Sequence, residues 1–190
     1  MKKDELAILI LAAGLSKRLG YPKQLVEYQG KSLLQNSIAK FSGLCKDIYV
    51  LLGNAFEECK KQSEGAKIIY HQDYHEGIGS SIKAGVKELL DFDFIMITLC
   101  DYPLLPQEHL KKMIDLKDPQ KIITTSRDET LSPPALFPKK FYPFLLDLKD
   151  DEGAKKIIKN HPKIQVELEK RYLLDIDTQE DINKLFDLAE

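Results

Sequence analysis

Short apolar runs alternate with amphipathic stretches along most of the chain. The apolar runs are typical of buried strands, because each is only about four to eight residues long and mainly aliphatic. They cover Leu6–Leu11, Ile48–Leu52, Lys67–Tyr70, Phe92–Leu99 and Lys121–Thr125. The intervening stretches repeat apolar residues at helical spacing and cover Ser32–Phe41, Ala55–Gln62, Ser80–Leu90 and Gln107–Leu116. This alternation predicts an α/β fold of three layers, in which a mostly parallel, doubly wound sheet lies between helices.

The later part of the chain is less regular because prolines interrupt it. Pro134–Pro138 is expected to be an edge strand, where the missing N–H of proline is tolerated. A helix over Glu152–Asn160, a strand over Ile164–Leu168 and a helix over Thr178–Leu188, capped by Thr178, complete the pattern. No internal repeat, linker or low-complexity segment interrupts the sequence, so residues 1–190 are expected to form a single domain.

Charge and apolar length exclude some classes of partner. The 28 basic and 30 acidic residues give a formal net charge of −2, so we expect no nucleic-acid partner. No apolar stretch approaches the roughly 20 residues needed to span a bilayer, so we expect no membrane association and a cytoplasmic protein. Cys45, Cys59 and Cys100 are far apart and lack the spacing of a zinc site, so reduced thiols are expected.

A glycine-containing loop directly follows the first expected strand. Its small residues Ala12, Ala13 and Gly14 let a ligand approach the backbone, and consecutive backbone amides can cradle an anion. Arg18 and Lys23 add positive charge to the same loop. Neither the GxGxxG fingerprint nor the GxxxxGK[ST] pattern of a Walker A loop is present. The loop therefore indicates a triphosphate site of another kind at the carboxyl edge of the sheet.

Gly79, Ser80 and Ser81 open the helix that follows the third strand. Glycine permits tight backbone geometry at a helix N-terminus, which faces the ligand edge of the sheet. The hydroxyl of Ser80 or Ser81 could bind a base or a ribose. The alternative for either serine is simple N-capping of the helix.

Two acidic positions are candidates for a metal site. Asp101 comes directly after the apolar strand Phe92–Leu99, where ligands gather, and Mg²⁺ prefers oxygen donors and phosphate partners. Asp175 and Asp177 stand two residues apart and would point the same way if the segment is extended. One of them could share the ion with Asp101. Helix capping by Asp101 and a solvated acidic turn at Asp175–Asp177 are the alternatives.

Several motifs occur together in a recognisable order. The pattern A-A-G-x-S-x-R-x-G-x-P-K-x-L, from Ala12 to Leu25, resembles the signature loop of the molybdenum cofactor nucleotidyltransferases, and among them the CTP-using cytidylyltransferases more than the GTP-using guanylyltransferases. Four later segments also resemble elements of that family, namely Gly79–Gly85, Cys100–Pro103, Asp151–Lys155 and Asp175–Asp181. The resemblance implies a Rossmann-like nucleotidyltransferase fold and gives Asp177 a role in metal binding.

The expected reaction is in-line attack of an acceptor phosphate oxygen on the α-phosphorus of an NTP, with pyrophosphate leaving. Lys23 would stabilise charge on the α-phosphate, Arg18 would hold the triphosphate, and Asp101 with Asp177 would hold Mg²⁺. The expected nucleotide-binding residues are Leu11, Ala12, Ala13, Gly14, Ser16, Arg18, Lys23, Gly79, Ser80 and Ser81. CTP is favoured, because the GTP-using branch tends to carry a second glycine where this chain has Ala13.

The acceptor is left more open than the nucleotide. Molybdopterin is the acceptor that the resemblance implies, with a molybdoenzyme or its maturation chaperone as protein partner. Ser132–Phe137 departs from the family, which has a glycine before a single proline, and Lys155 stands where an arginine is expected. GTP as donor, or a phosphosugar or phosphocholine as acceptor, is therefore an alternative. A non-catalytic nucleotide- or cofactor-binding protein of the same fold is an alternative from another class.

Overall fold

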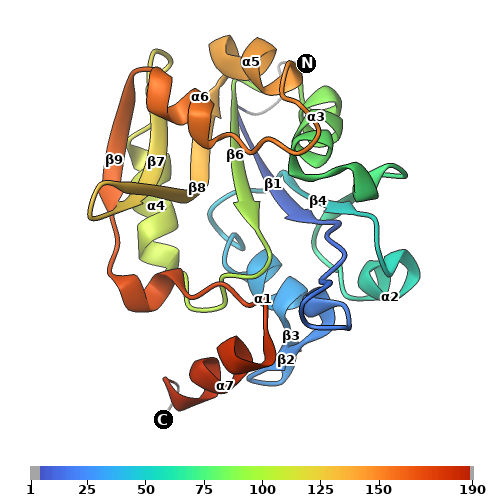
Figure 1. The fold of residues 1–190 in the computed structure, drawn as a ribbon. Helices are drawn as coiled ribbons and strands as arrows, with labels where there is room; N and C mark the ends of the chain where they lie inside the picture. The colour runs from blue at the N-terminus through green and yellow to red at the C-terminus, as the bar shows by residue number, and fades with distance from the viewer. Residues whose placement is uncertain (1–4, 189–190) are drawn as a thin grey trace.

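A seven-stranded sheet runs through the whole molecule (Figure 1). The computed structural model describes residues 5–188. The strands lie in the order β5-β4-β1-β6-β8-β7-β9. Their bounds are β1 Leu6–Ala12, β4 Ile48–Leu52, β5 Lys67–Tyr70, β6 Phe94–Leu99, β7 Ile122–Arg127, β8 Thr130–Pro138 and β9 Lys163–Glu167. β1 is buried along its whole length at the centre, as its unbroken aliphatic sequence predicts.

The sheet is mostly parallel, which confirms the fold class expected from the sequence. β1 pairs in parallel with both β4 and β6, with Leu11 beside Leu51 on one side and Leu99 on the other. β4 pairs in parallel with β5, and β7 pairs in parallel with β9. Within this seven-stranded sheet of the described residues, only β8 runs antiparallel to both of its neighbours. The parallel strands therefore bring their carboxyl ends to a common edge of the sheet.

The expectation of an edge strand at Pro134–Pro138 is wrong. β8 is longer and lies in the interior of the sheet, between β6 and β7. Pro133 and Pro134 are tolerated there because they lie outside the paired registers of the ladder. β7 pairs with Ala135 and then with Ser132, so Pro133 and Pro134 lie in an irregularity of the register. Pairing with β6 runs only from Ala135 to Pro138. A bulge, not an edge position, thus accommodates these prolines.

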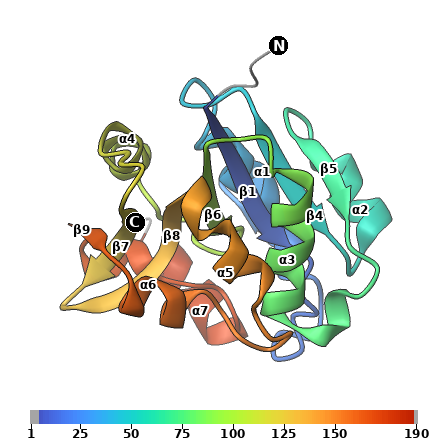
Figure 2. The ribbon, with the colours of Figure 1, turned by 90° about the horizontal axis from the view of Figure 1, so that it is seen from above.

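Helices cover both faces of the sheet (Figure 2). One face carries α1 Leu33–Ala39, α2 Phe56–Lys61 and α4 Gln107–Asp115, and the other carries α3 Ile78–Glu88, α5 Tyr142–Leu146 and α6 Lys155–Asn160. Each face has its own apolar core, because alternate residues of the strands point to opposite sides. Ile8 and Ile10 pack in one core, whereas Ala7 and Leu9 pack in the other.

The helix ends follow the local sequence in part. Ser32 caps α1 in a capping box with Gln35, as its position predicts. α6 begins at Lys155 instead of Glu152, after a turn that contains Gly153, and α5 was not predicted. Short 3₁₀ helices cover Lys23–Leu25, Tyr74–Glu76, Lys139–Phe141 and Lys170–Leu173. No helix within residues 5–188 is both long enough and apolar enough to cross a membrane.

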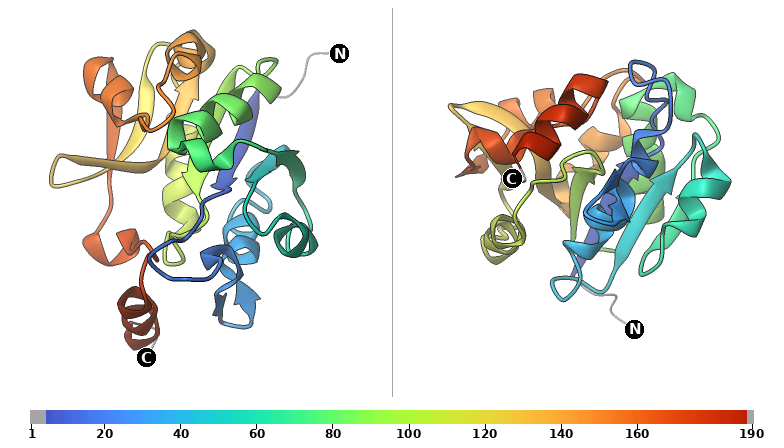
Figure 3. Two further views of the ribbon diagram at one scale, coloured as in Figure 1. Left: turned by 45° about the vertical axis from the view of Figure 1, so that its right-hand side comes forward. Right: turned by 90° about the horizontal axis from the view of Figure 1, so that it is seen from below.

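The last helix, α7 Gln179–Asp187, packs beside a small hairpin at one end of the molecule (Figure 3). The hairpin consists of β2 Glu27–Tyr28 and β3 Lys31–Ser32, and the sequence pattern did not predict it. Val26, Leu33, Ile182 and Leu185 contribute to a separate small core there. This packing brings the segment before α7 next to the first loop.

Candidate active site

A cavity of about 290 Å³ opens at the carboxyl ends of β1 and β6. It has walls from the first loop, from the start of α3 and from the turn after β6. Seven of the residues expected at the site line it, namely Leu11, Ala12, Ala13, Gly14, Lys23, Ser81 and Asp101. The carboxyl edge of a mostly parallel sheet is where such folds bind their ligands. The cavity therefore occupies the expected position for a nucleotide.

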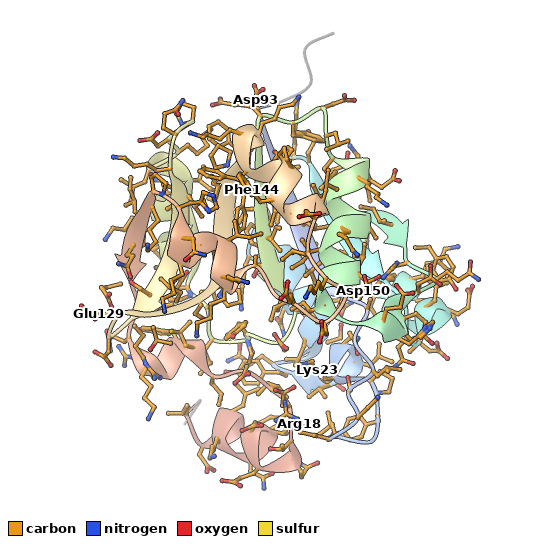
Figure 4. The ribbon with its side chains drawn as sticks, turned by 45° about the horizontal axis from the view of Figure 1, so that its top comes forward. Arg18, Lys23, Asp93, Glu129, Phe144 and Asp150 are labelled. Carbon is orange, nitrogen blue, oxygen red and sulfur yellow. The ribbon has the colours of Figure 1, made fainter. Side chains whose placement is uncertain are left out.

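Four charged side chains meet beside this cavity. The Lys23 ammonium lies between two carboxylates, donating to Asp101 Oδ2 and, at 2.8 Å, to Asp177 Oδ1. Arg18 donates to the other oxygen of Asp177 at 2.5 Å. Figure 4 shows Arg18 and Lys23 at the same end of the molecule. The side chain of Arg18 is 69% exposed and that of Lys23 only 15%, so the cluster extends from solvent to a nearly closed interior.

Burial and charge act together on the central pair. Burial opposes the charged form of Lys23, but the two carboxylates outweigh it and raise the pKa of the ammonium above its usual value. Burial raises the pKa of the Asp101 carboxyl, and the Lys23 ammonium opposes that shift. Asp101 is thus costly to ionise without a cation beside it. A positive charge at this position, from Lys23 or from a metal ion, stabilises the ionised form of Asp101.

The first loop is fixed by its own polar groups. Ser16 has a positive φ of 50°. Its hydroxyl accepts the backbone N–H of Lys23 at 3.0 Å, and its carbonyl accepts those of Leu19 and Gly20. Gln24 is fully buried, and its amide donates to the carbonyls of Ala12, at 2.7 Å, and Gly14, at 3.0 Å. Ser16 and Gln24 therefore hold Lys23 and the small residues in one arrangement.

The two carboxylates are held by the elements that follow them. The backbone N–H of Ile176 donates to the carbonyl of Asp101 at 3.0 Å, which joins the turn after β6 to the segment before α7. Asp181 accepts the backbone N–H groups of Asp177, at 3.2 Å, and of Thr178, at 2.9 Å, in the capping box of α7. Thr178 is the cap of the last helix, as predicted. Capping of α7 thus also orients Asp177.

The glycines before and within α3 serve a neighbouring segment of the chain. Gly77 has a φ of 137°, and a Cβ atom there or at Gly79 would collide with backbone atoms of 149–152. The N–H of Gly79 donates to the carbonyl of Asp150 at 2.8 Å, and Lys83 pairs with the Asp150 side chain. Figure 4 shows Asp150 close to α3. The two backbone segments can pack this closely only because positions 77 and 79 are glycine.

Some of the expected residues do not line the cavity. Ser80 is buried, and its hydroxyl bonds His71 Nε2 at 3.0 Å and Glu76 Oε2 at 2.9 Å. Gly79, Ser16 and Arg18 also lie outside the lining, although Arg18 contacts Asp177. Asp175 is exposed, and the segment that holds Asp175 and Asp177 is not a strand. Ser81 lines the cavity, and its hydroxyl donates to the carbonyl of Gly77.

The residues present fit a hard divalent cation. Asp101 Oδ1 is buried and has no hydrogen-bond partner among the described residues, so one carboxylate oxygen is available for a ligand. Residues 5–188 contain no cluster of three or more His, Cys, Asp or Glu side chains that could hold a metal by themselves. Mg²⁺ commonly takes one or two carboxylates and completes its shell with phosphate oxygens and water. Asp101 and Asp177 match that pattern, with the substrate as the remaining ligand.

Sequence reasoning missed three lining residues whose side chains carry a polar nitrogen or oxygen atom, namely Gln24, Tyr74 and His75. Gln24 has a detectable signal, since it is a polar residue within the first motif, between Lys23 and Leu25. Tyr74 and His75 follow β5 and precede Gly77. Their position after a strand, at the carboxyl edge of the sheet, is the sequence feature that could have indicated them as site residues. Polar residues at the ends of neighbouring strands meet only once the order of the strands is known.

The known proteins whose sequences are similar to this chain are named for different functions. Purine catabolism protein PucB of Bacillus subtilis is 29% identical over 84% of this chain and 83% of its own length. Nicotine blue oxidoreductase of Paenarthrobacter nicotinovorans is 27% identical over 81% of both chains. Molybdenum cofactor cytidylyltransferase of Escherichia coli is 25% identical over 91% of both chains.

Solved structures agree with the fold. Rv0371c of Mycobacterium tuberculosis superposes with a TM-score of 0.86 at 24% identity and covers 98% of this chain and 100% of its own. A second structure of Rv0371C, in complex with manganese, has a TM-score of 0.83 at 21% identity and covers 97% of this chain and 99% of its own. The family model of the MobA-like NTP transferase domain matches residues 8–166, which include the first loop and Asp101. The chain therefore belongs to the MobA-like NTP transferase family, a family of metal-dependent nucleotidyltransferases.

Proposed function

We propose that the protein transfers CMP from CTP to a phosphorylated small molecule and releases pyrophosphate, with Mg²⁺ as the cofactor. The observation that carries this proposal is the Lys23 ammonium between Asp101 and Asp177, beside a cavity of about 290 Å³ at the carboxyl edge of the sheet. Nucleotidyl transfer needs concentrated positive charge at the phosphates and a carboxylate site for the ion, and little covalent work by the protein. We further propose that residues 1–190 act as one nucleotidyltransferase domain in the cytoplasm.

The chain's own residues would bind and orient the two substrates. An acceptor phosphate oxygen forms a bond to the α-phosphorus, and the bond from the α-phosphorus to the β-phosphate oxygen breaks, so pyrophosphate leaves with the electron pair. Lys23 would turn from its carboxylates toward the α-phosphate, and Arg18 is exposed enough to reach the outer phosphates. Mg²⁺ held by Asp101 and Asp177 supplies charge neutralisation at the triphosphate. Gln24 would keep the loop carbonyls of Ala12 and Gly14 directed away from the phosphates.

The preference for CTP over GTP rests on the size and polarity of the cavity. Ala13 is buried and its methyl group belongs to the wall, where glycine would leave more room for a purine. Ser81 donates its hydroxyl hydrogen to the Gly77 carbonyl and so keeps an acceptor lone pair for the amino group of cytosine. A site that satisfies the polar edge of one base leaves buried groups unpaired with another base.

Molybdopterin is the first candidate for the acceptor, and a molybdoenzyme or its maturation chaperone the candidate protein partner. Support comes from the motifs in the sequence and from the 25% identity to a molybdenum cofactor cytidylyltransferase along 91% of the chain. Relatives named for purine catabolism and for nicotine blue oxidation are about equally similar, so the acceptor is the part of the proposal that most needs a direct test.

A panel of nucleotides and acceptors tests the proposal. Purified protein with Mg²⁺ is given each of the four NTPs together with molybdopterin, glucose 1-phosphate or phosphocholine, and pyrophosphate release is measured. We expect release with CTP at a kcat/KM about tenfold or more above that with GTP, and a weaker preference in Ala13→Gly. Equal or better use of GTP would remove the cytidylyl assignment. Nucleotide binding without pyrophosphate release for any pair would favour the non-catalytic alternative.

A further inference from the structure

A second cavity, of about 210 Å³, lies next to the nucleotide cavity. The two share Leu11, Ile78 and Leu99 as a common wall, so a molecule in the second cavity would lie beside the triphosphate site. The second cavity is enclosed by β6, by β8 and by the start of α3 and α6. It is thus placed where the second substrate of a transfer reaction has to bind.

The lining of this cavity is almost entirely hydrocarbon. Of the fourteen residues that line it, only Ser132 and Lys155 have polar side chains, and none is acidic. Phe137 is its one aromatic residue and is fully buried. Lys155 is exposed and therefore borders the mouth, within reach of solvent and of an anionic group there. The interior of the cavity has no polar side chain apart from Ser132 with which to pair a buried hydroxyl.

Three of the lining residues are positions at which this chain departs from the family pattern that the sequence resembles. Ser132 and Pro133 line the cavity in place of the expected glycine, and Lys155 stands in place of the expected arginine. Pro133 lies in the irregularity of β8, outside the ladder, so its ring is free to form a wall. The three departures from the family pattern therefore all lie in the wall of the apolar cavity.

We propose that this cavity binds an apolar part of the acceptor, namely an aromatic or aliphatic ring or a short branched hydrocarbon that carries the reacting phosphate. This inference rests on the proposed function and narrows its acceptor. An apolar cavity of about 150 Å³ in another protein stays dry and binds benzene, so 210 Å³ has room for a six-membered ring. The phosphate of such an acceptor lies outside the apolar interior, toward Lys155 and the triphosphate.

The chemistry of the lining counts against two of the acceptors considered above, a phosphosugar and phosphocholine. A phosphosugar would bury several hydroxyl groups against aliphatic side chains and lose their hydrogen bonds with water. Phosphocholine would bring a quaternary ammonium to a cavity without a carboxylate and with a single aromatic ring, whereas such cations are bound by aromatic cages. A flat or branched apolar group meets neither penalty. The burial of its surface is the main source of its affinity.

A matched pair of phosphate esters tests the proposal. Cyclohexyl phosphate and glucose 1-phosphate have a six-membered ring and the same charged group, but only the sugar carries hydroxyls. Binding of each to the protein loaded with Mg²⁺ and a non-hydrolysable CTP analogue is measured by calorimetry, and pyrophosphate release with CTP is measured separately. We expect cyclohexyl phosphate to bind about tenfold or more tightly than glucose 1-phosphate. Equal binding, or tighter binding of the sugar phosphate, would overturn the proposal.

Two variants test whether cyclohexyl phosphate binds in this cavity. Ala154→Leu adds three carbons to the wall of the cavity at a half-buried position, and Ala39→Leu makes the same change on the exposed face of α1. We expect Ala154→Leu to weaken cyclohexyl phosphate about tenfold, with the affinity for the CTP analogue unchanged, and Ala39→Leu to weaken neither. An unchanged affinity for cyclohexyl phosphate in a folded Ala154→Leu protein would contradict the cavity as its site. Binding of cyclohexyl phosphate without any pyrophosphate release would support the cavity and count against nucleotidyl transfer, so the two proposals fail separately.

Discussion

At the scale of the residue, the two oxygens of Asp101 have different surroundings. Oδ2 accepts the Lys23 ammonium, whereas Oδ1 is buried and has no partner among the described residues. An unpaired buried carboxylate oxygen is costly in a protein that only has to fold. The arrangement is therefore better suited to a bound cation than to stability, and it makes Asp101 the most informative position for mutagenesis.

We expect Asp101→Asn to lower kcat about 100-fold or more, because an amide cannot supply the charge that holds Mg²⁺ at the triphosphate. Asp175→Asn, an exposed acidic residue two positions from Asp177, is the matched control and should keep parental activity. Circular dichroism should show the same fold in both proteins. Activity of Asp101→Asn within a few-fold of the parent at saturating Mg²⁺ would exclude Asp101 from the mechanism.

Lys23→Ala is expected to reduce kcat far more than nucleotide affinity, because a charge that acts on the α-phosphate matters most in the transition state. Steady-state kinetics with CTP, together with calorimetric binding of a CTP analogue, separate the two effects. Lys17→Ala removes an exposed lysine from the same loop and serves as the control. The role given to Lys23 is wrong if affinity collapses while kcat at saturation stays the same.

Lys40 holds the turn that contains Asp101 without touching the nucleotide cavity. Its ammonium donates to the carbonyls of Tyr102, at 2.5 Å, and of Pro103, at 2.8 Å, and burial lowers its pKa to about 7. We expect Lys40→Met to weaken Mn²⁺ binding, followed by electron paramagnetic resonance, about tenfold, as loss of a partner behind a metal ligand commonly does. Gln107→Leu removes hydrogen bonds to the carbonyls of Lys40 and Ser42 instead. Equal weakening in both variants would mean that only general stability was lost.

At the level of the elements, the sequence predicted which segments are strands and helices better than it predicted which strands pair with one another. The aliphatic runs of β1, β4 and β6 were found because burial on both faces requires unbroken apolar sequence. The interior position of β8 could not be predicted from the sequence, because its prolines are typical of an edge strand. Only the pairing of β8 with β6 and β7 reveals the bulge that accommodates Pro133 and Pro134. Likewise the hairpin β2–β3 is too short to produce a periodic pattern. Charged residues that follow strands were predicted. Gln24 and Tyr74 carry a weaker signal, their place in the first motif and after β5, and their contact with the cavity forms only through tertiary packing.

A buried histidine supports β8 and should make stability depend on pH. His109 of α4 bonds Thr125 Oγ1 at 2.9 Å, and Thr125 in turn donates to the carbonyl of Pro134 at the bulge. Burial, with a smaller contribution from Lys112, lowers the pKa of His109 from 6.5 to about 4. The folded protein therefore binds fewer protons than the unfolded chain between these values. The stabilisation of the folded protein by neutral His109 is therefore present above about pH 6.5 and is lost as the pH falls toward 4.

The loss should be about 2 kcal/mol in the free energy of unfolding, measured by urea denaturation at pH 7 and at pH 4.5. His109→Gln should show a smaller difference between the two pH values than the parent does. His75→Gln, which changes an exposed histidine, should keep the parental difference. An identical pH dependence in parent and His109→Gln would show that His109 does not carry it.

At the scale of the whole molecule, the charged cluster exists only when the complete sheet has formed. Lys23 and Asp177 are 154 positions apart in sequence, and Lys23 and Asp101 are 78 apart. The family match ends at residue 166, so Asp177 and α7 complete the site from outside the matched region. Lys23 of the first loop and Asp177 of the segment before α7 thus meet at the candidate active site, beside the nucleotide cavity, which shares a wall with the apolar cavity.

Nucleotidyl transfer at this site is tested by identifying which bond of the nucleotide breaks. Phosphorus NMR of a reaction with CTP, Mg²⁺ and a phosphorylated acceptor distinguishes cleavage at the α-phosphorus from cleavage at the γ-phosphorus. Lys23, Asp101 and Asp177 acting at the α-phosphate predict that pyrophosphate and a CMP–acceptor diphosphate appear in equal amounts, and that neither forms when EDTA removes the metal. Formation of CDP with inorganic phosphate or a further phosphorylated acceptor, or pyrophosphate release that persists in EDTA, would contradict the account.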